Sequence, residues 1–160
     1  MDTSAQHLQQ RLRRIASEKA TVEDFNARNV VNVFDRTNWA IITAENPGSK
    51  ELSYEENLER TYQLKRLLES DQYHYLQCFG RYGDESNESL GFIVIGIDHD
   101  DAVWIGCNFG QESVITHKGL TFCEGGAVIP PKGVIVHSIT NRPATNYTYI
   151  PGVSVFAFEF

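Results

Sequence analysis

Apolar residues near the start of the chain recur at the spacing of a helix. Leu8, Leu12 and Ile15 stand at positions i, i+4 and i+7, which form one stripe of an amphipathic helix. Thr21, with an acidic residue three positions later, fits a capping box at the start of a second, shorter helix. The sequence therefore predicts a helical N-terminal extension over residues 1–37.

A strand, a sharp break and a long helix follow in that order. Residues 38–43 are rich in the aromatic and β-branched types that favour a strand. The Asn-Pro-Gly-Ser sequence at 46–49 ends this strand, because these residue types favour turns. Ser53 and Glu56 then form a capping box, which predicts a helix that runs to about Glu69.

A β-branched segment and a short helix occupy the middle of the chain. Residues 90–97 form an almost continuous apolar run, which is typical of a central strand with both faces buried. Either Asp98 or Asp100 can cap a helix that extends through Asn108. Gly110 fits the left-handed position that ends such a helix.

The rest of the pattern is β. Further strands are predicted at residues 72–80, 113–116, 120–123, 133–139 and 153–160. The fold class is therefore α+β, with N-terminal helices, a mostly antiparallel sheet and a β-rich C-terminal tail. We expect one domain over residues 1–160, divided into the N-terminal extension (1–37), a central module (38–118) and the tail (119–160). The last strand has two apolar faces, so we expect it to be an inner strand or to pair across a homodimer.

Composition and charge narrow the class of protein. The chain has 160 residues and a net charge of −7, and its basic residues cluster only at residues 11–14, so binding to nucleic acid is not expected. No apolar run approaches the ~18 residues that a membrane span requires, and the polar first residues do not resemble a secretory signal. Three cysteines without such a signal predict reduced thiols and a cytoplasmic location.

Motifs that would hold a cofactor or a metal ion are absent. The sequence has no glycine-rich phosphate loop, no Gly-x-Ser-x-Gly and no Cys-x-x-Cys. Cys107, His117, Cys123 and His137 have the residue types of a zinc site, but their spacing matches no zinc motif. We therefore expect no metal and no cofactor.

One polar residue lies on the apolar stripe of the long predicted helix. At about 100° per residue, Asn57 falls at the centre of the stripe that contains Leu64 and Leu68, and Arg60 falls on its flank. A buried amide needs partners, and the preceding turn at Asn46 can supply them. In one interpretation Asn57 only fixes the shape of that turn. In the other, the three polar residues line a pocket at the strand end, where arginine suits an anion.

Short motifs in this region resemble those of a bacterial family called domain of unknown function 3293. They are Thr-Ala-Glu-Asn-Pro at 43–47, Leu-Ser followed by Asn57 and Arg60, and Phe-Gly-Gln at 109–111. The resemblance covers roughly residues 38–118 and includes an acidic position matched by Glu88. It implies a polar signature made of Asn46, Pro47, Asn57, Arg60, Gly110 and Gln111. The family name assigns no activity, and Glu45 departs from the residue types usual at its position.

These observations favour a small domain that binds a small polar, nucleotide-like ligand at the turn that contains Asn46 and Pro47. The expected ligand-binding residues are Asn46, Asn57, Arg60, Gln111 and Glu88. Asn57 is expected to be both structural and functional, and Arg60 mainly functional. Whether the chain is an enzyme is left open, because Glu45 and Glu88 are the only acid or base candidates near the motif. The alternative is a protein-interaction module, such as a small inhibitor or adaptor, with contacts through the basic segment or the aromatic tail.

Overall fold

The structure is a computed structural model that describes residue 34, residues 37–83, residue 85 and residues 87–160. The predicted N-terminal helices therefore lie almost entirely outside the described residues. Phe34, which is described, is buried and packs against Trp39 with ring centroids 4.4 Å apart.

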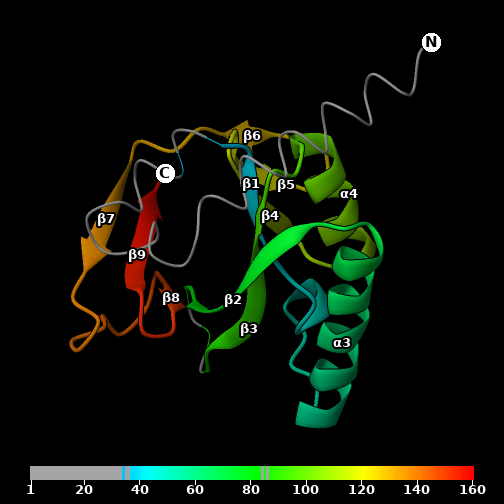
Figure 1. Cartoon of the computed structure of the whole chain (residues 1–160), viewed down its shortest axis with the longest axis horizontal. Coiled ribbons are helices and arrows are strands. Elements are labelled where there is room, and N and C mark those ends of the chain that lie inside the picture. Colours follow the sequence, from blue (N-terminus) through cyan, green and yellow to red (C-terminus); the bar gives the residue numbers. More distant parts are fainter. Residues whose placement is uncertain (1–33, 35–36, 84, 86) are drawn as a thin grey trace.

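Within the described part of the chain, nine strands form one antiparallel sheet, with two α-helices on one of its faces (Figure 1). The helices are α3 (Tyr54–Ser70) and α4 (His99–Asn108), and a short 3-10 turn, η2 (Pro47–Ser49), precedes α3. The strands are β1 (Trp39–Thr43), β2 (His74–Arg81), β3 (Ser89–Ile95), β4 (Ser113–Thr116), β5 (Gly119–Phe122), β6 (Val128–Ile129), β7 (Gly133–His137), β8 (Tyr147–Ile150) and β9 (Ser154–Glu159). Their order in the sheet is β6-β5-β4-β1-β3-β2-β8-β9-β7.

The α+β class and the mostly antiparallel sheet are confirmed, although the sheet contributes more of the structure than the helices do. Within the described range, the helices lie in the middle of the chain instead of at its N-terminal end. The strands of the C-terminal tail add to both sides of the central strands: β5 pairs with β4, and β8 pairs with β2.

The central strands β1 and β3 contact a core on each face of the sheet, and for β3 this confirms the prediction from the apolar run at residues 90–97. Along β3, Ile93 and Ile95 point into a core with Trp39, Cys78 and Phe156, a cluster enclosed by the curled sheet. The alternating residues of the same strands pack on the helix side. There they meet the fully buried side chains of α3, in a second core made of Ala40, Ile42, Ala44, Leu64, Leu68, Phe92, Val94, Ile97, Ala102, Ile105 and Val114.

The sheet is curled so strongly that its two edge strands approach each other. β6 and β7 stand at opposite ends of the strand order, yet only residues 130–132 separate them along the chain. Four Cα–Cα steps of about 3.8 Å each limit the distance from the end of β6 to the start of β7 to about 15 Å. Pro130 and Pro131 have no backbone N–H, so this link cannot continue the ladder of hydrogen bonds.

The prediction of three reduced thiols is wrong. Cys107 and Cys123 form a disulfide, with Cα atoms 5.6 Å apart, and among the described cysteines only the buried Cys78 is free. The bond forms because β4 pairs with β1 beneath α4, and the β4–β5 hairpin then returns the chain to the end of that helix. An odd number of cysteines still allows one disulfide. The cysteine count therefore no longer supports the predicted cytoplasmic location.

Two further findings concern the tail and the membrane. β9 pairs with β8 on one side and with β7 on the other, so it is an inner strand. Both of its backbone edges are used within the chain, which removes the reason for expecting a homodimer through it. No described helix combines the length and the apolar character needed to span a membrane.

Deletion of residues 153–160 should give insoluble or unfolded protein, because it removes the strand that joins β7 to the sheet and the fully buried Phe156. Solubility and circular dichroism would measure this. Deletion of Phe160 alone, which lies beyond β9, is the matched control and should leave the thermal unfolding curve in place. A soluble eight-residue truncation with an unchanged unfolding temperature would show that β9 is dispensable.

Candidate functional site

The turn after β1 has an unusual backbone conformation. Asn46 is left-handed, with φ of 47° and ψ of 62°, and Gly48 and Ser49 also have positive φ angles. Asparagine is one of the few residues with a side chain that enters this region readily. Three positive φ angles within four residues need external support, which the neighbouring elements supply.

The side chains of Asn46 and Asn57 hold the turn against the start of α3. The backbone N–H of Asn46 donates to Oδ1 of Asn57 over 2.9 Å, and Nδ2 of Asn57 donates to Oδ1 of Asn46 over 2.9 Å. The backbone N–H of Leu52 donates to the same Oδ1 of Asn46 over 3.0 Å. The interpretation of Asn57 as a residue that fixes the turn is therefore confirmed.

The capping box places Asn57 correctly. The backbone N–H of Glu56 donates to Oγ of Ser53 over 3.2 Å, and the backbone N–H of Ser53 donates to the Glu56 carboxylate over 3.4 Å. These bonds start α3 at Tyr54, as the sequence predicted, and fix the rotation of the helix. Asn57 then faces the turn from the stripe on which Leu64 and Leu68 are fully buried.

Arg60 joins the ends of two other elements. Its Nε donates to the carbonyl oxygen of Ala44 over 2.7 Å, and its terminal Nη2 donates to the carbonyl oxygen of Phe109. Phe109 is the C-cap residue of α4, so one guanidinium bridges the exit of β1 and the end of α4. No carboxylate among the described residues pairs with Arg60. Arg60 thus has a structural role that the sequence analysis did not assign to it.

Gly110 and Gln111 complete the same set of contacts. The Nε2 amide of Gln111 donates to the carbonyl oxygen of Glu45 over 3.0 Å, and the backbone N–H of Gly48 donates to the carbonyl oxygen of Gly110 over 2.7 Å. Gly110 has a φ of 80°, and a Cβ atom there would lie 2.7 Å from Cβ of Pro47. We refer to Asn46, Asn57, Arg60 and Gln111, with the backbone groups that they bond, as the turn network.

The two acidic candidates lie in different places. The Glu45 carboxylate accepts from the backbone N–H of Leu90 over 3.1 Å, directly beside the turn network. The Glu88 carboxylate instead pairs with Arg142 over 3.2 Å, in the segment that precedes β8. The structure therefore brings four of the five predicted site residues together and places the Glu88 side chain apart from them.

Burial affects the ionisation of Glu45. Desolvation raises the pKa of its carboxyl group, and the hydrogen bonds from the Leu90 backbone and the Ser89 side chain oppose this only in part. A raised pKa in the folded state means that the folded chain holds the proton more tightly than the unfolded chain does.

A groove of about 240 Å³ lies between α3 and the neighbouring strands. It is lined by Leu58, Thr61, Tyr62 and Lys65 of α3, Tyr75 and Gln77 of β2, and Leu90 and Phe92 of β3. Leu90 connects the groove with the turn, because its carbonyl oxygen accepts from Oγ1 of Thr43 over 2.9 Å and its N–H donates to Glu45.

The groove has preset aromatic walls and one unpartnered hydroxyl. Tyr75 packs edge-on against Phe92, with ring centroids 5.1 Å apart, and its phenol donates to the Glu69 carboxylate over 2.6 Å. Burial and that carboxylate raise the pKa of Tyr75 to about 12, so the phenol stays protonated. Thr61 is only 5% exposed, and its Oγ1 has no hydrogen-bond partner in the structure.

This groove was not among the sites predicted from the sequence. Tyr54, Leu58 and Tyr62 repeat at intervals of four residues on a helix whose apolar stripe lies elsewhere, and this was the available signal. The contributions of Gln77 and Leu90 depend on the register of β2 against β3, which the sequence does not reveal.

Substitution of Asn57 or Arg60, the two residues of α3 in the turn network, should destabilise the chain. Asn57→Leu leaves the part-buried N–H of Asn46 unpaired, and Arg60→Gln does the same to the carbonyls of Ala44 and Phe109, so we expect each to lower the free energy of unfolding by about 1–3 kcal/mol. Glu59→Gln, an exposed change on the same helix, is the control and should stay within about 0.5 kcal/mol of the wild type. Chemical denaturation would measure all three variants. If Arg60→Gln behaves like the control, its bonds to Ala44 and Phe109 are not structural.

Glu45 should make stability depend on pH in a defined direction. Its raised pKa gives a contribution that is complete below the unfolded pKa and is lost as pH rises through the folded pKa. The unfolding free energy of the wild type minus that of Glu45→Gln should therefore increase as pH falls from about 7 to about 5. Glu51→Gln, which removes an exposed carboxylate of the following segment, controls for the loss of charge. A difference that falls over this range would contradict the effect of burial.

Comparison with known proteins is consistent with this geometry. The chain matches a protein-family model described as "Protein of unknown function (DUF3293)" over residues 42–114, a range that contains every residue of the turn network. The resemblance predicted over roughly residues 38–118 is thereby confirmed. No curated protein matches the chain. Residues 42–114, from the middle of β1 into β4, thus match the DUF3293 family model, which covers less than half of the chain.

Proposed function

We propose that the chain binds a small, nucleotide-like ligand, and that the ligand occupies the groove between α3 and strands β2 and β3. The groove combines an aromatic wall with three polar lining residues, Gln77, Lys65 and Thr61, of which Thr61 holds its hydroxyl oxygen just beneath the surface. Aromatic side chains favour a planar ring, an amide can pair with the edge of a base, and lysine suits a phosphate.

The state of the turn network supports the groove over the turn as the place of binding. Both side-chain oxygens of Asn46 and Asn57 accept hydrogen bonds from within the chain, and the Nε2 amide of Gln111 donates to a backbone carbonyl. A ligand at the turn would have to compete with these bonds. The groove demands no such exchange, and the turn network then serves to hold α3 at its distance from β2 and β3.

The observation that carries the proposal is the Thr61 hydroxyl. A buried hydroxyl without a partner costs about 1–3 kcal/mol, so this side chain is expensive unless something completes it. Threonine in a helix can bond the carbonyl one turn earlier, but Oγ1 of Thr61 makes no such bond. Oγ1 is closed off from solvent in this structure, so a rotation of the Thr61 side chain would bring it to a polar atom of a bound ligand.

A cytoplasmic location is part of this proposal, since the expected ligand class is abundant there. Disulfides in that compartment are usually transient or redox-sensing, so the Cys107–Cys123 bond would then have to be reversible.

The second candidate function is protein interaction, and one observation favours it. Tyr54, Leu58 and Tyr62 are 75%, 50% and 52% exposed and follow one another along a single face of α3. Exposed tyrosines are enriched at protein interfaces. The support expected from the aromatic tail is weaker, because Tyr147 and Phe156 are buried in the fold. The basic segment at 11–14 lies outside the described residues.

Thermal shift with AMP, adenosine and ribose 5-phosphate as probes tests ligand binding. AMP should raise the unfolding temperature of the wild type more than either fragment does, because it fills both the aromatic and the ammonium side of the groove. A nucleotide at 100 times its Kd would stabilise the chain by roughly 2.7 kcal/mol.

Three variants locate the effect. Thr61→Val should leave the ligand-free protein at least as stable and should weaken the response to AMP, since it removes an unpaired hydroxyl without changing the shape of the side chain. Lys65→Gln should remove the advantage of AMP over adenosine, and Lys50→Gln, away from the groove, should not. Equal responses in all variants, or no response in the wild type, would reject the groove as a nucleotide site. Tyr54 does not line the groove, so Tyr54→Ser should leave AMP binding unchanged. The same variant should weaken binding of a protein partner to the exposed face of α3.

A further inference from the structure

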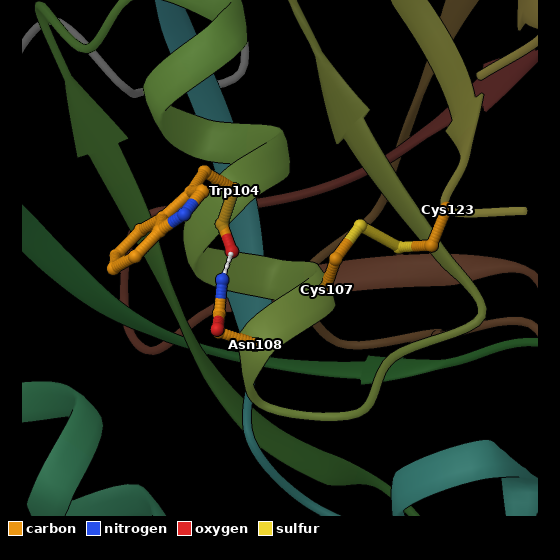
Figure 2. Close-up of a disulfide and its surroundings, with 4 residues drawn as sticks. All are labelled: Trp104, Cys107, Asn108 and Cys123. Atoms are coloured by element: carbon orange, nitrogen blue, oxygen red, sulfur yellow. Dashed lines mark hydrogen bonds between the residues drawn. A yellow bond between two sulfur atoms is a disulfide. The ribbon is translucent and has the colours of Figure 1, made fainter.

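The disulfide lies between α4 and the tail of the chain. Cys107 is in the last turn of α4, and Cys123 directly follows β5 (Figure 2). The bond therefore closes a covalent loop with a sequence separation of 16. Cys107 belongs to the segment that matches the DUF3293 family, whereas Cys123 lies outside it.

This covalent loop contains one complete side of the turn network. Three consecutive residues near its start contact the turn: the carbonyl oxygen of Phe109 accepts from Arg60, that of Gly110 accepts from Gly48, and the side chain of Gln111 donates to Glu45. The disulfide begins only two residues before this group. Reduction of the disulfide should therefore affect the residues that hold the turn before it affects more distant parts of the loop.

The two bonded cysteines are less buried than the free one. Both cysteines of the bond are only half-buried, while the free Cys78 is 1% exposed. Figure 2 shows the bond on the opposite side of α4 from Trp104, whose carbonyl oxygen accepts from Nδ2 of Asn108 over 2.7 Å. Burial raises the pKa of Cys78 to about 12, so it stays a thiol and does not exchange with the bonded pair.

Other contacts also hold together the elements that the bond connects. β4 and β5 remain joined by four register pairs, and the backbone N–H of Cys123 donates to the carbonyl oxygen of Glu112 over 3.0 Å. α4 and β4 are in such close contact that a Cβ atom on Gly106 would lie 2.2 Å from Cγ2 of Val114. Opening the disulfide therefore removes one covalent restraint from the loop, while the contacts between α4, β4 and β5 remain.

We propose that the Cys107–Cys123 disulfide is a reversible redox modification site, reduced by a dithiol, and that its state sets how firmly residues 109–111 hold the turn network. In the oxidised state the loop is held at both ends. In the reduced state the strand pairing and packing hold its tail end without the covalent bond, so the contacts to Gly48, Arg60 and Glu45 open more often. The proposal stands independently of the groove and its ligand.

The exchange is chemically balanced. A thiolate of the external dithiol attacks one sulfur of the bond and forms a mixed disulfide, and the second thiol of the donor then displaces the cysteine. The donor is oxidised to its own disulfide. Cys107 and Cys123 together gain two electrons and two protons and become thiols.

Amide hydrogen exchange of the full chain, followed by NMR with and without dithiothreitol, tests the proposal. The Gly48 N–H, which donates to the carbonyl oxygen of Gly110, should exchange about tenfold faster or more after reduction. Amides of β8 and β9, which the loop does not contain, should keep their rates. Reoxidation with glutathione disulfide should restore the slow exchange.

Two variants serve as controls. Cys107→Ser/Cys123→Ser should exchange at Gly48 as fast as the reduced wild type and should not respond to dithiothreitol. Cys78→Ala keeps the bond and should respond like the wild type. The proposal is overturned by three titratable thiols after oxidation, by an unchanged Gly48 rate on reduction, or by faster exchange of all amides together, which would make the bond a requirement of the whole fold.

Discussion

The two reciprocal hydrogen bonds between Asn46 and Asn57, one from the Asn46 backbone and one from the Asn57 side chain, determine how α3 sits on the sheet. Asn46 ends a buried strand, and Asn57 lies in the first turns of α3, eleven residues later. Because Asn57 uses both groups of its amide and Asn46 uses its backbone N–H and its side-chain oxygen, the direction in which the chain leaves β1 and the rotation of α3 are fixed together. The packing of Leu64 and Leu68 on the sheet, and the spacing that leaves the groove, both depend on this one contact.

The polar residues of the turn network have a structural explanation. The backbone carbonyls of Ala44 and Phe109, one after a strand and the other at a helix end, need donors from elsewhere in the chain. Arginine has a planar group with several N–H donors, and it can therefore serve two carbonyls that approach from different elements. A lysine in place of Arg60 would supply the charge without this geometry. In the sequence, these motifs suggested a ligand site although some fifty residues separate them. In the fold, their side chains join the end of β1, the start of α3 and the end of α4.

Local rules predicted much of this arrangement, and the failures share one cause. The capping box at Ser53, the left-handed Gly110 and the doubly buried β3 each depend on neighbouring residues, and each is found as predicted. The pairing of Glu88 with Arg142 and the disulfide depend on which strands become neighbours. Strands β6 and β8 are only two and four residues long, so their alternation is too short to mark them before their partners are known.

The tail completes the family segment physically. That segment ends within β4, and of the strands matched, β4 and β2 have the outer positions in the sheet order. Without the tail, both would present unpaired backbone groups of the kind that promotes aggregation. The tail instead adds β5 and β6 on one side and β8, β9 and β7 on the other, and the link at residues 130–132 carries the chain between the two edges. Cys123 directly follows β5, the tail strand that covers the edge of β4, and Cys107 lies at the end of α4, next to the residues that hold the turn. The disulfide therefore joins the tail strand to the turn network. A change at the edge of the sheet can therefore reach the turn through a single covalent link.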